Sequence, residues 1–258
     1  MIVLPELHTH PYFCQLEDPV AFNQAEAVPG PTTETLSAIA RELDVVIVAS
    51  IFERRAAGLY HNTAVVLERD GRIAGSYRQM HTADYPGCYQ KYYFTPGDLG
   101  FTPINTSVGR LGVLVGWDQW FPEAARLMTL AGADLLLYPT AIGWNPEEDE
   151  DERQRQWEAW IIAQRAHAIA NALPVVVCNR VGSEDDPSGQ TAGISFWGTS
   201  FIIGPQGEWL GTTSSEEPAT LVVEVDLGRS EEVRQAWPYL RDRRIEGYSG
   251  LQKRYLDH

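Results

Sequence analysis

Short apolar runs rich in β-branched residues recur along this chain of 258 residues, and they constrain its fold more than any other feature. Runs of this length, bounded by turn residues, predict β-strands. We expect strands at residues 2–4, 45–50, 63–67, 111–115, 135–138, 175–178, 199–203 and 221–225. Asp70 with Gly71, and Pro205 with Gln206 and Gly207, follow two of these runs and predict hairpin turns.

Segments with helical spacing of apolar residues alternate with some of these strands. Helices are predicted at residues 32–43 behind a threonine cap, at 122–131 after an initial proline, and at 154–172 before Pro174. Because hairpins are mixed with crossover helices, we expect sheets covered by helices rather than a uniform (β/α)₈ alternation. No linker rich in Gly, Pro or Ser and no internal repeat divides the sequence, so residues 1–258 are expected to form a single α/β domain.

The charge of the chain restricts its partners. The net charge is −15, which argues against nucleic acids and anionic membranes, whose binding needs clustered Lys and Arg. The same charge is compatible with a cationic small ligand, although it also serves solubility. Residues 147–152 form an unbroken run of acids, which is either a solvated loop at the positive end of a helix or an acidic lip that attracts amines.

The cysteine content and the first residues bear on the compartment. Cys14, Cys88 and Cys178 are too few, and odd in number, for a disulfide framework, which favours a reducing compartment and a cytoplasmic protein. No apolar run approaches the roughly 18 residues of a membrane span. Residues 1–5 enter a strand-like run without a basic stretch or a cleavage signature, so no signal peptide is expected.

Residues 111–123 read LGVLVGWDQWFPE and predict a buried strand, a tight turn and then a helix. Such an elbow places one residue at the edge of the sheet, close to free backbone N–H groups. Enzymes use this geometry for a nucleophile beside an oxyanion hole. The residue at the apex is Gly116, which carries no reacting atom, and an elbow glycine on its own is also typical of a plain tight turn.

Residues 2–10 read IVLPELHTH, so Glu6 follows a strand. A carboxylate at the end of a strand can serve as a general base, while the alternative is a surface glutamate in a loop. A second interpretation involves a metal, because Glu6, His8 and His10 are spaced by two and share a face in an extended chain. No clear second pair of histidine ligands accompanies them.

Residues 77–98 combine a strand with a long loop rich in Tyr, Pro and Gly that could grip a ligand. Gln79 ends the strand, and Cys88 and Gln90 lie in the loop. Cys88 is either an accessible, reactive thiol or an inert one, since no neighbouring base is evident. Cys178, in VVVCN, is typical of core packing.

Several segments together resemble the nitrilase superfamily of carbon–nitrogen hydrolases, and within it the N-carbamoylputrescine amidohydrolases. The resemblance lies in PELHTHPYFCQ, in YRQMH with YQKYYFTPGDLGF, and in GVLVGWDQWFPEAARLM. It continues through LLLYPTAIG, AHAIANALPVVVCNRVG and FWGTSFIIGPQGE to RDRRIEGYSGL, and so covers nearly the whole chain. Each motif is only moderately specific, but their joint order is highly specific.

The resemblance implies a four-layer αββα sandwich and a homodimer or larger homo-oligomer. It also implies a Glu–Lys–Cys mechanism that uses no metal and no organic cofactor. In the family reaction the cysteine attacks the carbamoyl carbon, the glutamate transfers protons, and the lysine and a backbone N–H stabilise the oxyanion. N-carbamoylputrescine and water would give putrescine, carbon dioxide and ammonia. The family has a further strand and helix before the strand that bears the glutamate, so this chain is expected to lack the first strand and helix.

Carried over residue by residue, the resemblance gives an incomplete catalytic set. Glu6 stands at the position of the base, Gln79 at that of the lysine, Gly116 at that of the cysteine, and Gln90 at that of a supporting glutamate. Trp117 keeps the backbone N–H that follows the nucleophile. The resemblance places Trp117, Trp120, Ala141 and Ile142 in the pocket walls.

The three substitutions are consistent with one another in charge. Without a thiolate and an ammonium, a second carboxylate beside Glu6 would be an uncompensated buried charge, and the amide of Gln90 avoids that cost. The sequence therefore predicts an inactive or strongly impaired homologue that binds a small amide or carbamoyl ligand, and the net charge is compatible with a cationic one. The alternatives are an active amidase with Cys88 as a displaced nucleophile, a metal-dependent hydrolase using Glu6, His8 and His10, and a purely structural oligomer partner.

Overall fold

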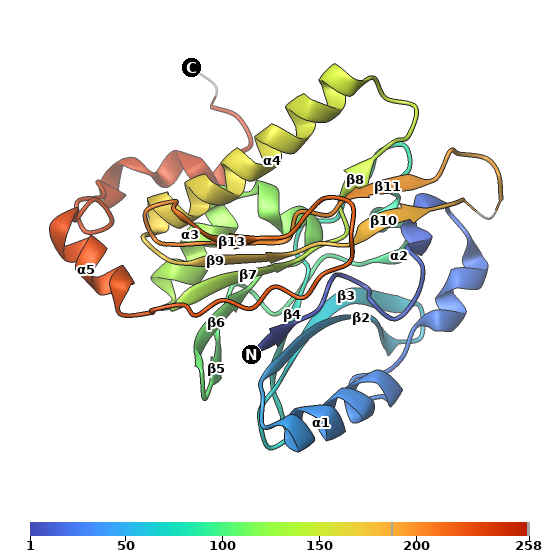
Figure 1. The fold of residues 1–258 in the computed structure, drawn as a ribbon, viewed down its shortest axis with the longest axis horizontal. Helices are drawn as coiled ribbons and strands as arrows, with labels where there is room; N and C mark the ends of the chain where they lie inside the picture. Colours follow the sequence, from blue (N-terminus) through green and yellow to red (C-terminus); the bar gives the residue numbers. More distant parts are fainter. Residues whose placement is uncertain (187, 257–258) are drawn as a thin grey trace.

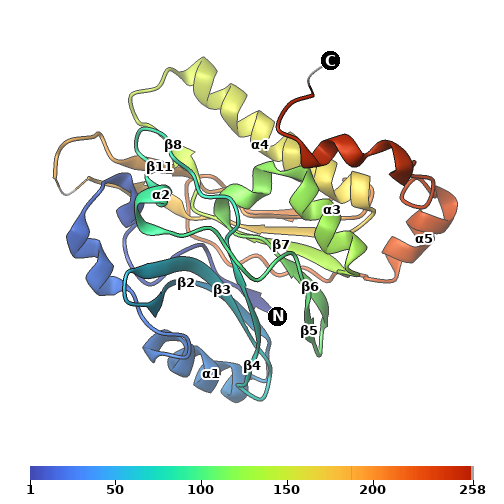
Figure 2. The same ribbon diagram turned by 180° about the vertical axis from the view of Figure 1, so that it is seen from behind.

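The computed structural model describes residues 1–186 and 188–256. The chain folds into two large β-sheets with helices on their outer sides, and a smaller sheet lies at one end (Figures 1 and 2). Within the described ranges, none of the helices is long and apolar enough to cross a bilayer.

The first sheet has the order β1-β2-β3-β4, and its strands are β1 Ile2–Val3, β2 Ile47–Ala56, β3 Leu59–Leu67 and β4 Ile73–Arg78. β1 pairs parallel with β2, and the other neighbours pair antiparallel. The predicted hairpin at Asp70 and Gly71 is confirmed, since β3 and β4 flank it in antiparallel register.

The second sheet has the order β13-β12-β9-β7-β6-β5. Its strands are β5 Ile104–Thr106, β6 Gly109–Val113, β7 Leu135–Pro139, β9 Val175–Cys178, β12 Phe201–Ile203 and β13 Trp209–Thr212. The central strands β6, β7 and β9 are parallel, and the hairpin predicted at residues 205–207 joins β12 to β13. The small third sheet consists of β8 Gly143–Trp144, β10 Val181–Glu184 and β11 Ile194–Trp197.

The helices are α1 Pro31–Leu43, α2 Gln90–Tyr93, α3 Pro122–Leu130, α4 Glu150–Asn171 and α5 Arg229–Ala236. Short 3₁₀ helices are η1 Phe13–Gln15, η2 Pro19–Gln24, η3 Gly116–Trp120, η4 Ile245–Gly247 and η5 Ser249–Gln252. α1 packs on β2 and β3, whereas α3 contacts β6 and α4 contacts β9 (Figure 1).

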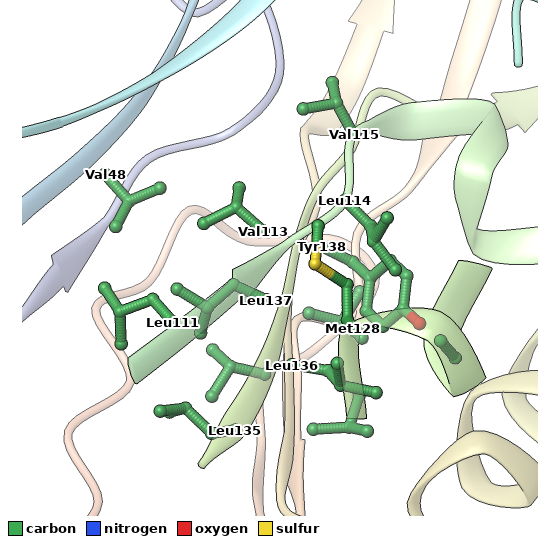
Figure 3. Close-up of a cluster of buried hydrophobic side chains, with 14 of the residues drawn as sticks. Val48, Leu111, Val113, Leu114, Val115, Met128, Leu135, Leu136, Leu137 and Tyr138 are labelled. Atoms are coloured by element: carbon green, nitrogen blue, oxygen red, sulfur yellow. The ribbon is translucent and has the colours of Figure 1, made fainter. Parts of the chain in front are cut away.

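The alternating direction of the side chains along β2 and β3 explains how the first sheet packs on both of its faces. Val48 and Val66 belong to the main core with the second sheet, while the neighbouring Ile47 and Val65 pack with Ala40 of α1. Successive side chains of a strand point to opposite faces, so this sheet is buried between the helix and the other sheet. Figure 3 shows Val48 facing the second sheet across this core. The order of layers is therefore helix, sheet, sheet, helix, as the resemblance implied.

The predicted strand at residues 221–225 is wrong. These residues form no β-ladder in the described structure, although Leu221, Val223 and Val225 pack partly buried against the main core. The alternation of apolar and polar residues at 221–225 reflects a half-buried surface. β-propensity largely measures the fit of a residue to such a surface, so the pattern can occur without strand pairing.

Two helix starts also differ from the prediction. The N-cap of α1 is Gly30 and not a threonine, because Pro31 already occupies the first helical position. The hydroxyl of Thr33 accepts the N–H of Gly30 at 2.7 Å. α4 begins at Glu150, so part of the acidic run forms its first turn, where carboxylates suit the positive end of the helix dipole.

Candidate active site

Glu6 lies in a turn directly after β1 and is almost fully buried, with 1% of its surface exposed. Its Oε1 accepts hydrogen bonds from Asn62 Nδ2 at 2.6 Å and from Gln90 Nε2 at 3.0 Å. Its Oε2 accepts the backbone N–H of Ala141 at 2.9 Å. Glu6 is therefore a buried, oriented carboxylate, and the interpretation of it as a surface loop residue is wrong.

Gln79 and Gln90 meet beside this carboxylate. Gln79 Nε2 donates to Gln90 Oε1 at 3.1 Å, and Gln79 Oε1 accepts from Asn62 Nδ2 at 3.0 Å. Gln90 Nε2 also donates to the hydroxyl of Tyr12 at 3.2 Å. The structure thus brings the predicted Glu6, Gln79 and Gln90 into one hydrogen-bonded network, which Asn62 completes.

Gly116 begins η3, at the elbow that the sequence predicted between β6 and α3. Asp118 fixes this elbow, because its Oδ2 accepts the N–H of Val115 at 3.1 Å and the hydroxyl of Tyr77 at 2.8 Å. Gly116 has φ +51°, in the left-handed region that favours glycine. A Cβ at position 116 would lie 2.6 Å from Oε1 and 2.7 Å from Oε2 of Glu6. The carboxylate therefore fills the space that a side chain at the apex would need.

Burial has the largest effect on the pKa of Glu6, at the centre of this cluster. Desolvation raises the pKa of Glu6 to about 7, against smaller lowering effects of the Asn62 hydrogen bond, the charge of Arg180 and the Ala141 N–H. All three hydrogen-bond partners of the carboxylate are neutral. The site therefore stabilises the neutral acid relative to the carboxylate.

Sequence reasoning missed Asn62 and Arg180. Asn62 links Glu6 to Gln79 and is itself held by the hydroxyl of Ser50 at 2.7 Å. Arg180 Nε donates to the backbone oxygen of Glu6 at 3.1 Å, and its Nη1 lies 2.7 Å from Glu184. Asn62 stands in no quoted motif, and Arg180 lies in AHAIANALPVVVCNRVG without any local sign of a role, because the roles of both residues arise from the contact of distant segments.

The metal interpretation fails on geometry. Residues 6–9 form a turn, with Leu7 at φ +49°, so Glu6, His8 and His10 do not share the face that an extended chain would give them. Both oxygens of Glu6 are engaged by N–H donors. Within the described ranges, no group of three or more His, Cys, Asp or Glu side chains could hold a metal ion.

Cys88 is not the accessible loop thiol that one interpretation required. Only 5% of its surface is exposed, and its Sγ lies 3.3 Å from the hydroxyl of Tyr12. Burial raises the pKa of the Cys88 thiol to about 12. A thiol that is both buried and protonated is a poor nucleophile, so the structure argues against a displaced nucleophile at this position.

We expect Cys88 to resist alkylation in the native protein. A rise in pKa from 9.0 to about 12 leaves about 10³-fold less thiolate at neutral pH, before any loss of access is considered. Iodoacetamide labelling, followed by peptide mass mapping, should modify Cys88 at least about 10³-fold faster in urea than in buffer. Equal rates in the two solvents would restore Cys88 as a candidate nucleophile.

A cavity of about 700 Å³ lies next to the cluster, between the loop that precedes α2, the elbow, β8, the start of α4 and β11. Trp117, Trp120 and Ile142 line it, whereas Ala141 does not and instead donates its N–H to Glu6. Glu147 and Glu148 also line the cavity, which supports the lip interpretation for this part of the acidic run.

The lining of the cavity includes none of the four residues assigned to the catalytic positions. Figure 1 shows β8 and β11, which contribute residues to the cavity wall, close together.

Comparisons with known proteins agree on one family. The sequence model of the carbon–nitrogen hydrolase family matches residues 1–235. N-carbamoylputrescine amidase of Solanum lycopersicum is 41% identical over 254 residues, which are 97% of this chain and 83% of that protein. Citrullinase of Francisella tularensis is 35% identical over 258 residues, covering 99% of this chain and 87% of that protein.

Solved structures show the same likeness. The carbon–nitrogen hydrolase from Helicobacter pylori G27 superposes with a TM-score of 0.96 at 55% identity, over 99% of this chain and 87% of that chain. An amidase variant from Nesterenkonia sp. AN1 superposes with a TM-score of 0.74 at 26% identity, over 97% of this chain and 85% of that chain. The latter structure shows the result of Michael addition of acrylamide at the active site cysteine of that amidase.

Proposed function

Because this chain belongs to the carbon–nitrogen hydrolase family, we propose that it binds a small amide or carbamoyl compound in its cavity and does not hydrolyse it. One observation carries the proposal. The position that we assign to the nucleophile is Gly116, and the carboxylate of Glu6 occupies the space of the missing side chain. No atom at this position can attack a carbonyl carbon.

The chemistry of the remaining groups supports the absence of turnover. Covalent catalysis needs a nucleophile that forms the acyl intermediate, and in enzymes of this kind its loss removes most of the rate acceleration. Gln79, at the proposed lysine position, can donate a hydrogen bond but carries no charge, so it stabilises an oxyanion about half as well. Glu6 can still exchange a proton, but position 116 has no nucleophilic atom that this proton transfer could activate.

The cavity retains features suited to an amide or carbamoyl ligand. Trp197 is 3% exposed and lines the cavity, and its indole N–H has no hydrogen-bond partner among the described residues. The indole N–H of Trp120, another lining residue, is likewise buried without a partner in the described structure. Buried donors favour an acceptor, and a ligand carbonyl oxygen would supply one. The names of the relatives make N-carbamoylputrescine the first compound to test, and citrulline the second.

The compartment, the assembly and the metabolic context of the protein are part of the proposal. We place it in the cytoplasm as a homodimer or larger homo-oligomer of one domain, in or beside polyamine metabolism. Size-exclusion chromatography with light scattering would test the assembly independently of any ligand.

Calorimetric titration with N-carbamoylputrescine, followed by an ammonia assay of the same sample, tests the function. We expect saturable binding with a 1:1 stoichiometry per chain and no ammonia above the protein-free control. Absence of binding at millimolar N-carbamoylputrescine would contradict the proposal that this compound is a ligand. Ammonia released in proportion to the protein concentration would contradict the proposal that the protein does not hydrolyse it.

A further inference from the structure

Three arginines from separate segments gather at the C-terminal end of α4. Arg126 of α3 donates from Nη2 to the backbone oxygen of Ala170 at 2.8 Å, and Arg234 of α5 donates from Nη2 to that of Asn171 at 3.0 Å. These two oxygens belong to consecutive residues, so the two guanidinium groups meet at one place. Arg243 lies in the segment after α5, and its charge acts on Arg126. Figure 2 shows this C-terminal segment, in red, beside α4.

Capping of α4 leaves some donors of these side chains unused. The hydroxyl of Tyr239 donates to the backbone oxygen of Ile169, so each of the last three carbonyl groups of α4 accepts one side-chain donor. Nη1 of Arg126 and Nε of Arg234 are buried and have no hydrogen-bond partner in the described part of the chain. A buried donor on a charged group is destabilising without an acceptor, so both N–H groups favour a bound ligand that accepts hydrogen bonds.

The three arginines also have no acidic partner. None of them forms a salt bridge within the described ranges, whereas Arg78 and Arg180, which are also half-buried, each pair with a glutamate. Burial lowers the pKa of Arg126, and the positive charges of Arg243 and Arg234 lower it further. In a chain with a net charge of −15, this cluster is therefore a local concentration of uncompensated positive charge.

The number of donors and charges indicates the class of anion. A guanidinium group matches the paired oxygens of a carboxylate or a phosphate. The buried donors of Arg126 and Arg234 would already engage both oxygens of a carboxylate, whereas a phosphate has further oxygens and a second charge for Arg243. The negative end of the α4 dipole opposes an anion, but it amounts to about half an elementary charge against three positive side chains.

We infer that Arg126, Arg234 and Arg243 form a binding site for a phosphate-type oxyanion at the C-terminal end of α4. The site goes beyond the proposed function, because none of the three arginines lines the cavity. The cavity reaches α4 only at Gln156 and Ala159, and Ala159 is roughly 16 Å along the helix from the carbonyl groups that the arginines cap.

Inorganic phosphate is the first probe, and ³¹P NMR line broadening on titration with the full chain gives its dissociation constant. We expect saturable binding at about millimolar phosphate or tighter, with acetate displacing it only at about tenfold higher concentration or above. Phenyl phosphate in the same competition distinguishes a phosphate ester from free phosphate as the natural source of the group. Sodium chloride keeps the ionic strength constant, and the exclusion effect by which phosphate stabilises many proteins does not saturate.

Arg243→Gln tests the cluster without removing a cap of α4, since the last three carbonyl groups of that helix accept from other side chains. This variant should weaken phosphate binding by about tenfold or more. Arg241→Gln is the matched control, because it removes the same charge two residues away from an exposed arginine that pairs with Asp242. The control should change the affinity by less than about twofold.

Several outcomes would overturn the inference. These are binding that does not saturate, an equal loss of affinity in the two variants, and acetate that competes as well as phosphate. If Arg243→Gln does not fold, modification of the parent protein by phenylglyoxal with peptide mass mapping decides. Phosphate should then slow the modification of Arg243 and leave that of Arg241 unchanged, and equal slowing of both would contradict the site.

Discussion

The triple variant Gly116→Cys/Gln79→Lys/Gln90→Glu is expected to release ammonia from N-carbamoylputrescine at least about 10³-fold faster than the parent protein. The reason is that the parent lacks the attacking atom, whereas the variant places a thiol at the elbow and an ammonium beside Glu6. Initial rates from a coupled ammonia assay, at equal protein concentration, measure the ratio.

The single variant Gly116→Cys is expected to release no more ammonia than the parent. Its Cβ would lie 2.6 Å from Oε1 of Glu6, which is closer than a normal contact, so the carboxylate would have to move. Position 116 also has φ +51°, which costs an L-residue about 1–2 kcal/mol. In the triple variant the ammonium at position 79 offers the displaced carboxylate a new partner.

The matched control is Gly116→Ala/Gln79→Lys/Gln90→Glu, which carries the same charges and the same Cβ but no sulfur. It should stay at the rate of the parent. A control as active as the thiol variant would show that position 116 is not where the nucleophile belongs. An inactive but folded thiol variant that still binds the ligand would contradict our assignment of positions 79 and 90.

Ionisation of Glu6 is expected to cost the folded protein about 3 kcal/mol of stability. Burial raises the pKa of Glu6 from 4.5 to about 7, so the folded state binds the proton more tightly than the unfolded state. The contribution of Glu6 is therefore most favourable below pH 4.5, falls as the pH rises from 4.5 to about 7, and is constant above that.

Urea unfolding of the parent and of Glu6→Gln between pH 4 and pH 8 isolates this effect, because the other titrating groups cancel in the difference. The parent should lose about 3 kcal/mol relative to the variant across this range. A difference that does not depend on pH would contradict the burial of an ionisable carboxyl at this site. Should Glu6→Gln fail to fold, ¹³C NMR titration of the Glu6 carboxyl in the parent gives its pKa directly.

The sequence allowed much of the fold to be predicted because its signals were local. The strand-to-elbow-to-helix segment around Gly116 and the hairpin at Asp70 and Gly71 depend on turn chemistry and short apolar runs, and both are present. Residues 221–225 show the limit of such signals, since alternating burial without strand pairing has the same pattern as a strand.

Part of the candidate site was predictable: residue patterns pointed to Glu6 and Gly116, and the family resemblance gave Gln79 and Gln90 their positions in the catalytic set. The resemblance selected Glu6, Gln79 and Gln90, and the structure places their side chains in one hydrogen-bonded network. The roles of Asn62, in β3, and of Arg180, between β9 and β10, could not be predicted, because each side chain bonds to Glu6, which lies more than 50 positions away in the sequence. The closeness of the Glu6 carboxylate to position 116 also had no signal in the sequence, since it depends on how two separate sheets pack.

Binding without hydrolysis can be observed in a single sample with N-carbamoylputrescine labelled with ¹³C at the carbonyl carbon. We predict that the protein broadens the carbonyl signal, that excess unlabelled ligand reverses the broadening, and that the labelled carbonyl keeps its full intensity over days at neutral pH. Growth of a ¹³C-bicarbonate signal at a rate proportional to protein concentration would contradict binding without turnover. A carbonyl signal that the protein never broadens would contradict binding itself.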